Sequence, residues 1–191
     1  MKFSRLLFSV TASLLLTACG SFLTAIEADP IQDEPSERTF AQQIEDESIE
    51  TKAQVNLHAA NAAYHEANLA IVSYNGYVLL AGQVATPELK DEATEVVKLI
   101  RGVRRIYNEL EIASPSSVMT RSSDAWITTK VKTYLLGRSD TEGTRVKVVT
   151  EDGVVYLMGL VTREEAERIS GVAADISGVQ RVVRLFEIVP S

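Results

Sequence analysis

Cysteine is almost absent from this 191-residue chain, in which Cys19 is the single residue of its kind. That scarcity excludes an internal disulfide and argues against a cysteine-rich metal site. Positive charge is also in deficit, because 19 lysines and arginines stand against 26 acidic residues and the net charge is −7. Without a large basic field, the chain is not expected to bind nucleic acid.

The N-terminus, residues 1–18, has the pattern of a secretory signal. Lys2 and Arg5 precede an almost wholly apolar stretch, Leu6 to Leu16, that is too short to cross a membrane as a helix. The run Leu16-Thr17-Ala18-Cys19 resembles the lipobox of bacterial lipoproteins, in which a leucine and two small residues precede a cysteine. We therefore expect cleavage before Cys19. The alternative is a plain secretory signal in which this cysteine occurs by chance.

The lipobox resemblance implies that Cys19 is lipidated, because a thiolate is a nucleophile that can accept a diacylglyceryl group. Lipoproteins of this type carry acyl chains such as palmitate, and stable anchoring takes at least two chains. Gly20 follows the cysteine, whereas an aspartate there usually signals inner-membrane retention in Gram-negative bacteria. The resemblance thus implies a lipid anchor in the outer membrane, on its periplasmic face.

The rest of the chain divides into a tether and two copies of one module. Residues 27–37 combine Asp, Glu and Pro with little apolar content, which is typical of a disordered spacer. Residues 114–117, Ser-Pro-Ser-Ser, are typical of a linker and separate the two copies. The expected boundaries are a signal peptide at 1–18, a lipidated cysteine and tether at 19–38, a first module at 39–113, a linker at 114–123 and a second module at 124–191.

The duplication is visible as short blocks that recur in the same order. About 18 identities over roughly 65 residues exceed what chance gives for ordered blocks. The recurring blocks are Asp46, Ile49, Thr51, Lys52 and Leu57 with Asp124, Ile127, Thr129, Lys130 and Leu135; residues 75–82 with 152–159; residues 102–105 with 178–181; and residues 110–112 with 186–188.

Each copy begins with a helix and a hairpin. In the second copy Asp124 can cap a helix whose apolar residues recur at helical spacing. The pairs Asn75-Gly76 and Asp152-Gly153 predict tight hairpin turns, because a primed turn requires positive φ. The predicted apolar stripe of the helix in the second copy consists of Ile127, Val131, Tyr134 and Leu135.

Each copy then continues with a helix and a last strand. Thr162 and Glu165 have the spacing of a capping box, and Gly178, like Gly102 in the first copy, is placed to end the helix. Because the last strand arrives through a helical crossover, we expect it to pair in parallel. The predicted fold class is α+β, with two tandem αββαβ modules, each a three-stranded mixed sheet packed on two helices.

The order of elements, the glycine that closes the second strand (Gly82, Gly159) and the Gly-Val pair before the last strand (Gly102, Gly178) resemble the BON domain. Two such modules behind a lipobox resemble the dual-BON outer-membrane lipoproteins, the division- and outer-membrane-stress-associated lipid-binding family. That resemblance implies a periplasmic protein without enzymatic activity that binds anionic phospholipid and supports outer-membrane integrity. It also implies links to the β-barrel assembly machinery and to division-site proteins.

The sequence contains no recognisable catalytic motif or metal-binding motif. His58 and His65 are seven residues apart and could share a helix face, but Leu136 replaces His58 in the second copy. A solvated or structural role is the favoured interpretation of both histidines, and a metal site is the alternative. The acidic residues clustered at 91–95 are expected in the first turn or on an exposed face of a helix, where the helix dipole favours negative charge. We expect no cofactor, no metal and no enzymatic activity.

The two copies differ in charge and in their first helix. Residues 46–112 hold six basic and ten acidic residues, net −4, whereas residues 124–188 hold nine and ten, net −1. The single tryptophan, Trp126, opens the first helix of the second copy, where the first copy has Ser48. Helical spacing places Trp126 beside the core stripe, with Lys130 one turn later.

An indole beside lysines at the start of a helix suits a membrane interface, where the ring lies among headgroups and the cations meet phosphates. We therefore predict that the second module binds anionic phospholipid, with Trp126 and Leu136 inserting, although Tyr134 could belong to the core. The alternative is a protein-interaction module, in which the acidic first copy docks on an envelope machine and Trp126 packs between the modules or on a protein partner. The predicted binding residues are Trp126, Lys130, Lys132, Tyr134, Leu136 and Arg138.

Overall fold

A computed structural model describes residues 38–141 and 143–190. The predictions for the signal peptide, for Cys19 and for most of the tether lie outside the described residues. Within them, none of the helices combines the length and the apolar character that crossing a bilayer requires.

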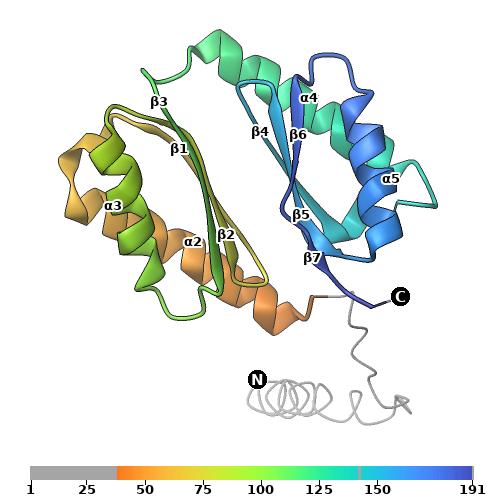
Figure 1. Cartoon of the computed structure of the whole chain (residues 1–191), viewed down its shortest axis with the longest axis horizontal. Helices are drawn as coiled ribbons and strands as arrows, with labels where there is room; N and C mark the ends of the chain where they lie inside the picture. The colour runs from red at the N-terminus through yellow and green to blue at the C-terminus, as the bar shows by residue number, and fades with distance from the viewer. Residues whose placement is uncertain (1–37, 142, 191) are drawn as a thin grey trace, which may run out of the picture. The chain divides into compact units, whose positions relative to one another are not determined.

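The first module has the predicted order of elements (Figure 1). Its hairpin strands β1 and β2 are antiparallel, and β3 pairs in parallel with β2. The prediction of one parallel pairing through a helical crossover is therefore confirmed. The elements are α2 (Phe40–Ala60), the 3-10 turn η1 (Ala62–His65), β1 (Asn68–Tyr74), β2 (Tyr77–Val84), α3 (Pro87–Lys98) and β3 (Arg105–Ile112).

The second module repeats this order, and the fold class is confirmed. Strands β4 and β5 are antiparallel, while β6 and β7 both pair in parallel with β5. The predicted last strand is thus divided, at Leu185 and Phe186, into two short pieces. The elements are α4 (Val118–Leu136), η2 (Gly143–Arg145), β4 (Val146–Glu151), β5 (Val154–Val161), α5 (Arg163–Ala174), β6 (Arg181–Arg184) and β7 (Glu187–Ile188).

Each module has a core between its two helices and one face of its sheet. In the second module Ile127, Val131 and Leu135 of α4 pack on Val155 and Leu157 of β5. The first module uses the equivalent positions of α2 and β2. Tyr134, placed in the α4 stripe by its spacing, is 58% exposed, so that assignment was wrong.

The hairpin turns have the predicted backbone. Asn75 and Gly76 have φ of 52° and 73°, and Asp152 and Gly153 have φ of 46° and 73°. Positive φ at both central residues is the requirement of the primed turn. The predicted capping box of α5 is also present, because Thr162 and Glu165 exchange side-chain-to-backbone hydrogen bonds.

The prediction that Asp124 caps the first helix of the second module was wrong. Ser117 caps α4, which begins at Val118 inside the segment expected to be linker. Asp124 is instead buried, and its carboxylate accepts hydrogen bonds of 2.9 Å from the backbone N–H groups of Asp152 and Gly153. A carboxylate that satisfies two turn amides fixes the hairpin against the helix.

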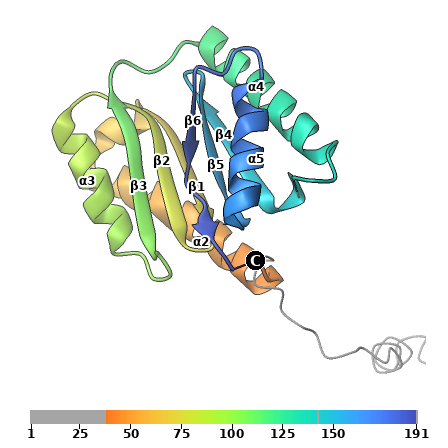
Figure 2. The same cartoon turned by 45° about the vertical axis from the view of Figure 1, so that its right-hand side comes forward.

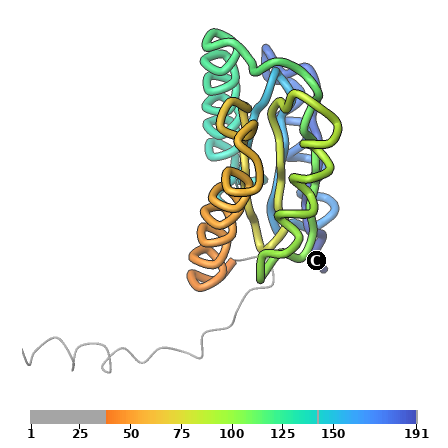
Figure 3. The backbone as a smooth tube through the Cα atoms, turned by 90° about the vertical axis from the view of Figure 1, so that its left-hand side faces the viewer, coloured from red at the N-terminus to blue at the C-terminus, as the bar shows by residue number. Residues whose placement is uncertain are grey.

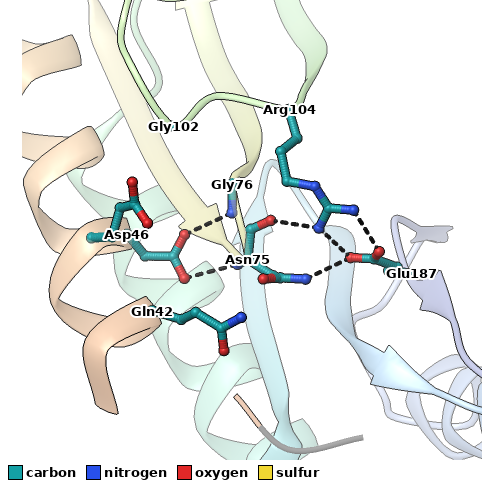
Figure 4. A pocket seen from close by; sticks show the side chains of 8 residues that line it. Gln42, Asp46, Asn75, Gly76, Gly102, Arg104 and Glu187 are labelled. Atoms are coloured by element: carbon teal, nitrogen blue, oxygen red, sulfur yellow. Dashed lines mark hydrogen bonds and ion pairs between the residues drawn. The ribbon is translucent and has the colours of Figure 1, made fainter. Parts of the chain in front are cut away.

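Asp46 makes the equivalent contacts in the first module, where its carboxylate accepts hydrogen bonds of 2.8 Å and 2.9 Å from the backbone N–H groups of Asn75 and Gly76 (Figure 4). It also accepts bonds from the Ser73 hydroxyl and from Arg38, which forms an ion pair of 2.7 Å with it. The recurrence of this aspartate in both copies therefore has a structural cause, namely the satisfaction of buried turn amides.

The two sheets pack against each other through the faces that the helices leave uncovered (Figure 2). Leu79 and Tyr74 of the first sheet meet Tyr156, Met158 and Leu160 of the second in a third apolar cluster. The helices consequently lie on the two outer sides of a four-layer arrangement, which Figure 1 shows edge-on, and Figure 3 looks onto it from the side of α2 and α3.

Polar bonds close the edges of this inter-sheet contact. The Tyr74 hydroxyl donates to the Arg145 carbonyl at 2.8 Å, and Asn68 donates to the Glu151 carboxylate at 3.0 Å. The Arg104 guanidinium makes two bonds, of 2.9 Å and 2.8 Å, to the Glu187 carboxylate (Figure 4). A paired, two-bond geometry of this kind fixes the orientation of the modules more than a single surface ion pair does.

Glu151 makes the inter-sheet contact sensitive to pH. Burial raises its pKa, and the nearby Asp124 carboxylate raises the pKa further. Because the folded pKa lies above the unfolded one, this group's contribution to stability is fully present below the unfolded pKa and is lost as pH rises through the folded pKa. We expect Glu151→Gln, which keeps an oxygen for Asn68, to raise the melting temperature near neutral pH and to have no effect near pH 3.5. An equal effect at both pH values in thermal melts would contradict this assignment.

Candidate functional site

The outer face of α4 is exposed because the opposite face is fixed to the sheet by Ile127, Val131 and Leu135. Trp126 is 61% exposed, so it lies outside the core stripe of α4. It is also not sealed between the modules, since it is absent from the inter-sheet cluster. The indole is therefore free to contact a partner.

Other apolar side chains extend this surface along the helix. Met119 is 82% exposed, and Val118 and Leu136 are exposed as well. Sequence reasoning missed Val118 and Met119 because residues 114–123 were expected to be linker. The signal that could have found them is Ser117, a favoured N-cap residue, placed directly before them. We call the exposed residues Val118, Met119, Trp126, Lys132 and Leu136, together with the half-buried Lys130, the α4 face.

The polar residues between these apolar side chains satisfy their hydroxyls within the helix. Ser122 donates to the Val118 carbonyl at 2.9 Å, and Thr129 and Thr133 each donate at 2.8 Å to the carbonyl four residues earlier. Removing a hydroxyl from water costs little when its hydrogen bond is already made. The α4 face therefore loses few hydrogen bonds when a partner excludes water from it.

All exposed charges of α4 are positive. Its single acidic residue is Asp124, which is buried on the hairpin, whereas Arg121, Lys130 and Lys132 face outward or partly outward. The Lys130 ammonium lies 5.3 Å from the centre of the Trp126 ring, within the range of a cation–π contact. The structure thus brings together the indole and the lysine that the sequence singled out.

Tyr134 and Arg138 lie apart from Trp126, in a pocket of about 430 Å³ between α4 and the end of α5. Arg138 makes two bonds, of 3.0 Å and 2.9 Å, to the Asp140 carboxylate. These bonds raise the pKa of Arg138 and lower that of Asp140. The charge of Arg138 is therefore balanced by Asp140, and among the predicted binding residues the attraction for an anion rests on Lys130 and Lys132. Lys130, Tyr134, Arg138, Val172, Asp175, Ile176 and Ser177 line the pocket.

The histidine pair does not lie on one helix face, as the sequence had allowed. His58 belongs to α2 and His65 to η1, with their ring centres 4.1 Å apart and a side-chain contact of 2.7 Å between Gln54 and His58. Within residues 38–141 and 143–190, no group of three or more His, Cys, Asp or Glu side chains is placed to hold a metal ion.

Comparison with known proteins gives a family and several relatives. The BON domain matches residues 45–114 and again residues 123–190. The chain is 34% identical to "Outer membrane lipoprotein DolP" of Haemophilus influenzae over 190 residues, which cover 96% of this chain and 95% of the relative. It is 36% identical to "21 kDa hemolysin" of Actinobacillus pleuropneumoniae, covering 80% of this chain and 78% of that protein. It is 32% identical to "Osmotically-inducible protein Y" of Escherichia coli, covering 55% and 54% of the two chains.

Proposed function

Because this chain belongs to the BON-domain family, as a dual-BON outer-membrane lipoprotein, we propose that it binds anionic phospholipid through the α4 face of its second BON domain and thereby supports the integrity of the cell envelope. Its place is the outer membrane, on the periplasmic side. Its action is binding rather than catalysis.

The observation that carries this proposal is the composition of the α4 face. An exposed indole and three other exposed apolar side chains share this helix with two lysines, and the helix has no exposed carboxylate. Each lysine near an anionic surface contributes about 1 kcal/mol, and an indole prefers the headgroup region. Neither contribution requires a deep pocket, which fits a contact with a lipid surface.

A lipid on Cys19 complements this contact. We propose that the acylated cysteine keeps the protein at the membrane while the α4 face sets which side of the folded part meets the bilayer. A weak surface contact suffices for that purpose, because an anchored domain stays within reach of the lipid at a high effective concentration.

Vesicle flotation of the soluble chain from Glu34 onward tests the proposal. We expect binding to vesicles rich in phosphatidylglycerol and weak binding to phosphatidylcholine vesicles. Trp126→Ala should lower the bound fraction about tenfold or more, since an indole contributes roughly 1.5–3 kcal/mol when it leaves water. Leu99→Ala, which changes an 85% exposed residue at the end of α3, is the matched control and should bind like the wild type.

Equal binding to neutral and anionic vesicles would contradict the proposal, and so would an absence of binding to both. The second result would favour a protein partner in the envelope, such as the β-barrel assembly machinery or a division-site protein.

A further inference from the structure

The outer face of α2 is a second unpartnered helix surface. Phe40 is 74% exposed, and Ile44 and Val55 are also exposed along the same helix. Helix α2 covers the outer side of the first sheet and α4 the outer side of the second, with the inter-sheet contact between them (Figure 1). A membrane on the α4 face therefore leaves the outer face of α2 uncovered.

Charge argues against lipid as the occupant of α2. Four acidic residues and one lysine lie in this helix, and Glu45 and Glu47 are exposed. An anionic bilayer would repel these carboxylates, since each unit charge near its surface is worth about 1 kcal/mol. A protein surface that supplies a positive charge at a fixed position is the better complement.

The outward residues of α2 lie in two adjacent rows. The exposed Ile44 and Thr51 and the half-buried His58 form one row, and the exposed Ala41 and Val55 with the half-buried Ser48 form the row beside it. Ala41, Ile44 and Val55 are the apolar members of these rows, and apolar side chains at this spacing are the pattern of a helix that packs along another helix. The small side chains of Ala41, Ser48 and Thr51 allow the two helices to approach closely.

The charges beside these rows are complementary to those of the same flank on a second copy. Glu45 and Lys52 are seven residues apart on one flank, and neither has an ion pair anywhere in the described part of the chain. When two such helices run antiparallel about a twofold axis, residues of the same flank meet. Glu45 then faces Lys52 of the partner subunit, and the symmetric pair forms as well. On the other flank Glu47 faces Gln54 of the partner subunit.

We propose that the outer face of α2 is a self-association surface, through which two copies of this protein pair as antiparallel helices. The twofold axis passes close to Ser48, and Ile44 packs into the space between Thr51 and Val55 of the partner subunit. One helix face of 21 residues gives a small interface, below the size of stable dimers, so the pair is weak and is favoured by confinement at a membrane. Both α4 faces stay uncovered in the pair.

Cysteine cross-linking tests this geometry directly, because the soluble chain from Glu34 onward contains no cysteine. Ser48→Cys should form a disulfide-linked dimer when two thiols are oxidised by oxidised glutathione at a protein concentration near 0.2 mM. Leu99→Cys, on an exposed residue away from α2, is the control and should stay monomeric. Equal cross-linking of the two variants, or none of Ser48→Cys, would contradict the proposal.

A charge exchange tests the pairing independently. In sedimentation equilibrium, Glu45→Lys should weaken self-association about tenfold, because two attractions become two repulsions. The double variant Glu45→Lys/Lys52→Glu should restore the wild-type association. A wild type that remains monomeric up to 0.5 mM, or a double variant no better than the single one, would overturn the proposal. Lys130→Glu/Lys132→Glu should leave self-association unchanged, so this result and the vesicle result are independent.

Discussion

Replacing Gly82 with alanine is expected to destabilise the folded part by about 2–5 kcal/mol, because the substitution adds backbone strain to a collision in the core. Gly82 has φ of 111°, and a Cβ there would lie 2.0 Å from the Asn68 carbonyl oxygen on the paired strand. Neither the strand nor the sheet behind it can move away without breaking the inter-sheet contact. Urea denaturation followed by circular dichroism measures the loss.

Gly171→Ala is the matched control for Gly82→Ala. Gly171 lies inside α5, and a Cβ there meets no atom within 4 Å. The same substitution should therefore stabilise the protein by roughly 0.5–1 kcal/mol, the usual gain of alanine over glycine in a helix. A Gly82→Ala protein as stable as the wild type would contradict the close strand contact.

Reversing both free cations of the α4 face should have the largest effect on membrane binding. Lys130→Glu/Lys132→Glu turns two attractions of about 1 kcal/mol each into repulsions, so the partition onto phosphatidylglycerol vesicles should fall by roughly two to three orders of magnitude at low salt. Both side chains point away from the core, so the circular dichroism spectrum should not change. Rising salt should weaken wild-type binding in the same direction.

A charge-matched control separates the α4 face from net charge. Lys98→Glu/Arg101→Glu makes the same change in net charge on the first module, where Lys98 makes only an exposed pair of 3.5 Å with Glu95. This variant should keep most of the wild-type binding. If both double variants lose binding equally, the attraction is a property of the whole protein and the α4 face has no special part in it.

The duplication and the hairpin pairs allowed most of the fold to be predicted from the sequence. Asn75-Gly76 and Asp152-Gly153 fix the turns by their backbone requirement, which is local and therefore legible in one sequence. The start of α4 was misplaced for the opposite reason. An aspartate before an apolar stripe suits a helix cap, but Asp124 is used by turn amides almost thirty residues later, a tertiary contact that no local pattern contains.

The face-to-face packing of the two sheets could have been predicted from the continuous apolar character of β2 and β5. The prediction of the strands considered only which of their residues face the helices. Every residue of β5, from Val154 to Val161, is buried, and nearly all of β2 is buried too. A strand covered on both sides reads as a continuous apolar run. These two runs are the strands that lie between the helices and the inter-sheet cluster.

The sequence identified residues of the candidate site that do lie together, but it did not give their exposure or their ion pairs. Trp126 and Lys130 do lie together, because one helical turn separates them. The exposure of Tyr134 and the compensation of Arg138 by Asp140 depend on how α4 is rotated and on where the following loop turns back. Those features are set by the packing of α4 on α5 and β4, which helical spacing alone does not determine.

The emission of Trp126 tests the central claim most directly, because it is the single tryptophan of the chain and needs no label. On addition of phosphatidylglycerol vesicles, the emission maximum should shift to shorter wavelength, and phospholipids brominated near the headgroup end of their acyl chains should quench it. An emission maximum that stays unchanged at saturating lipid, with acrylamide in the water quenching the ring as strongly as before, would show that the indole does not enter the bilayer and would contradict the account.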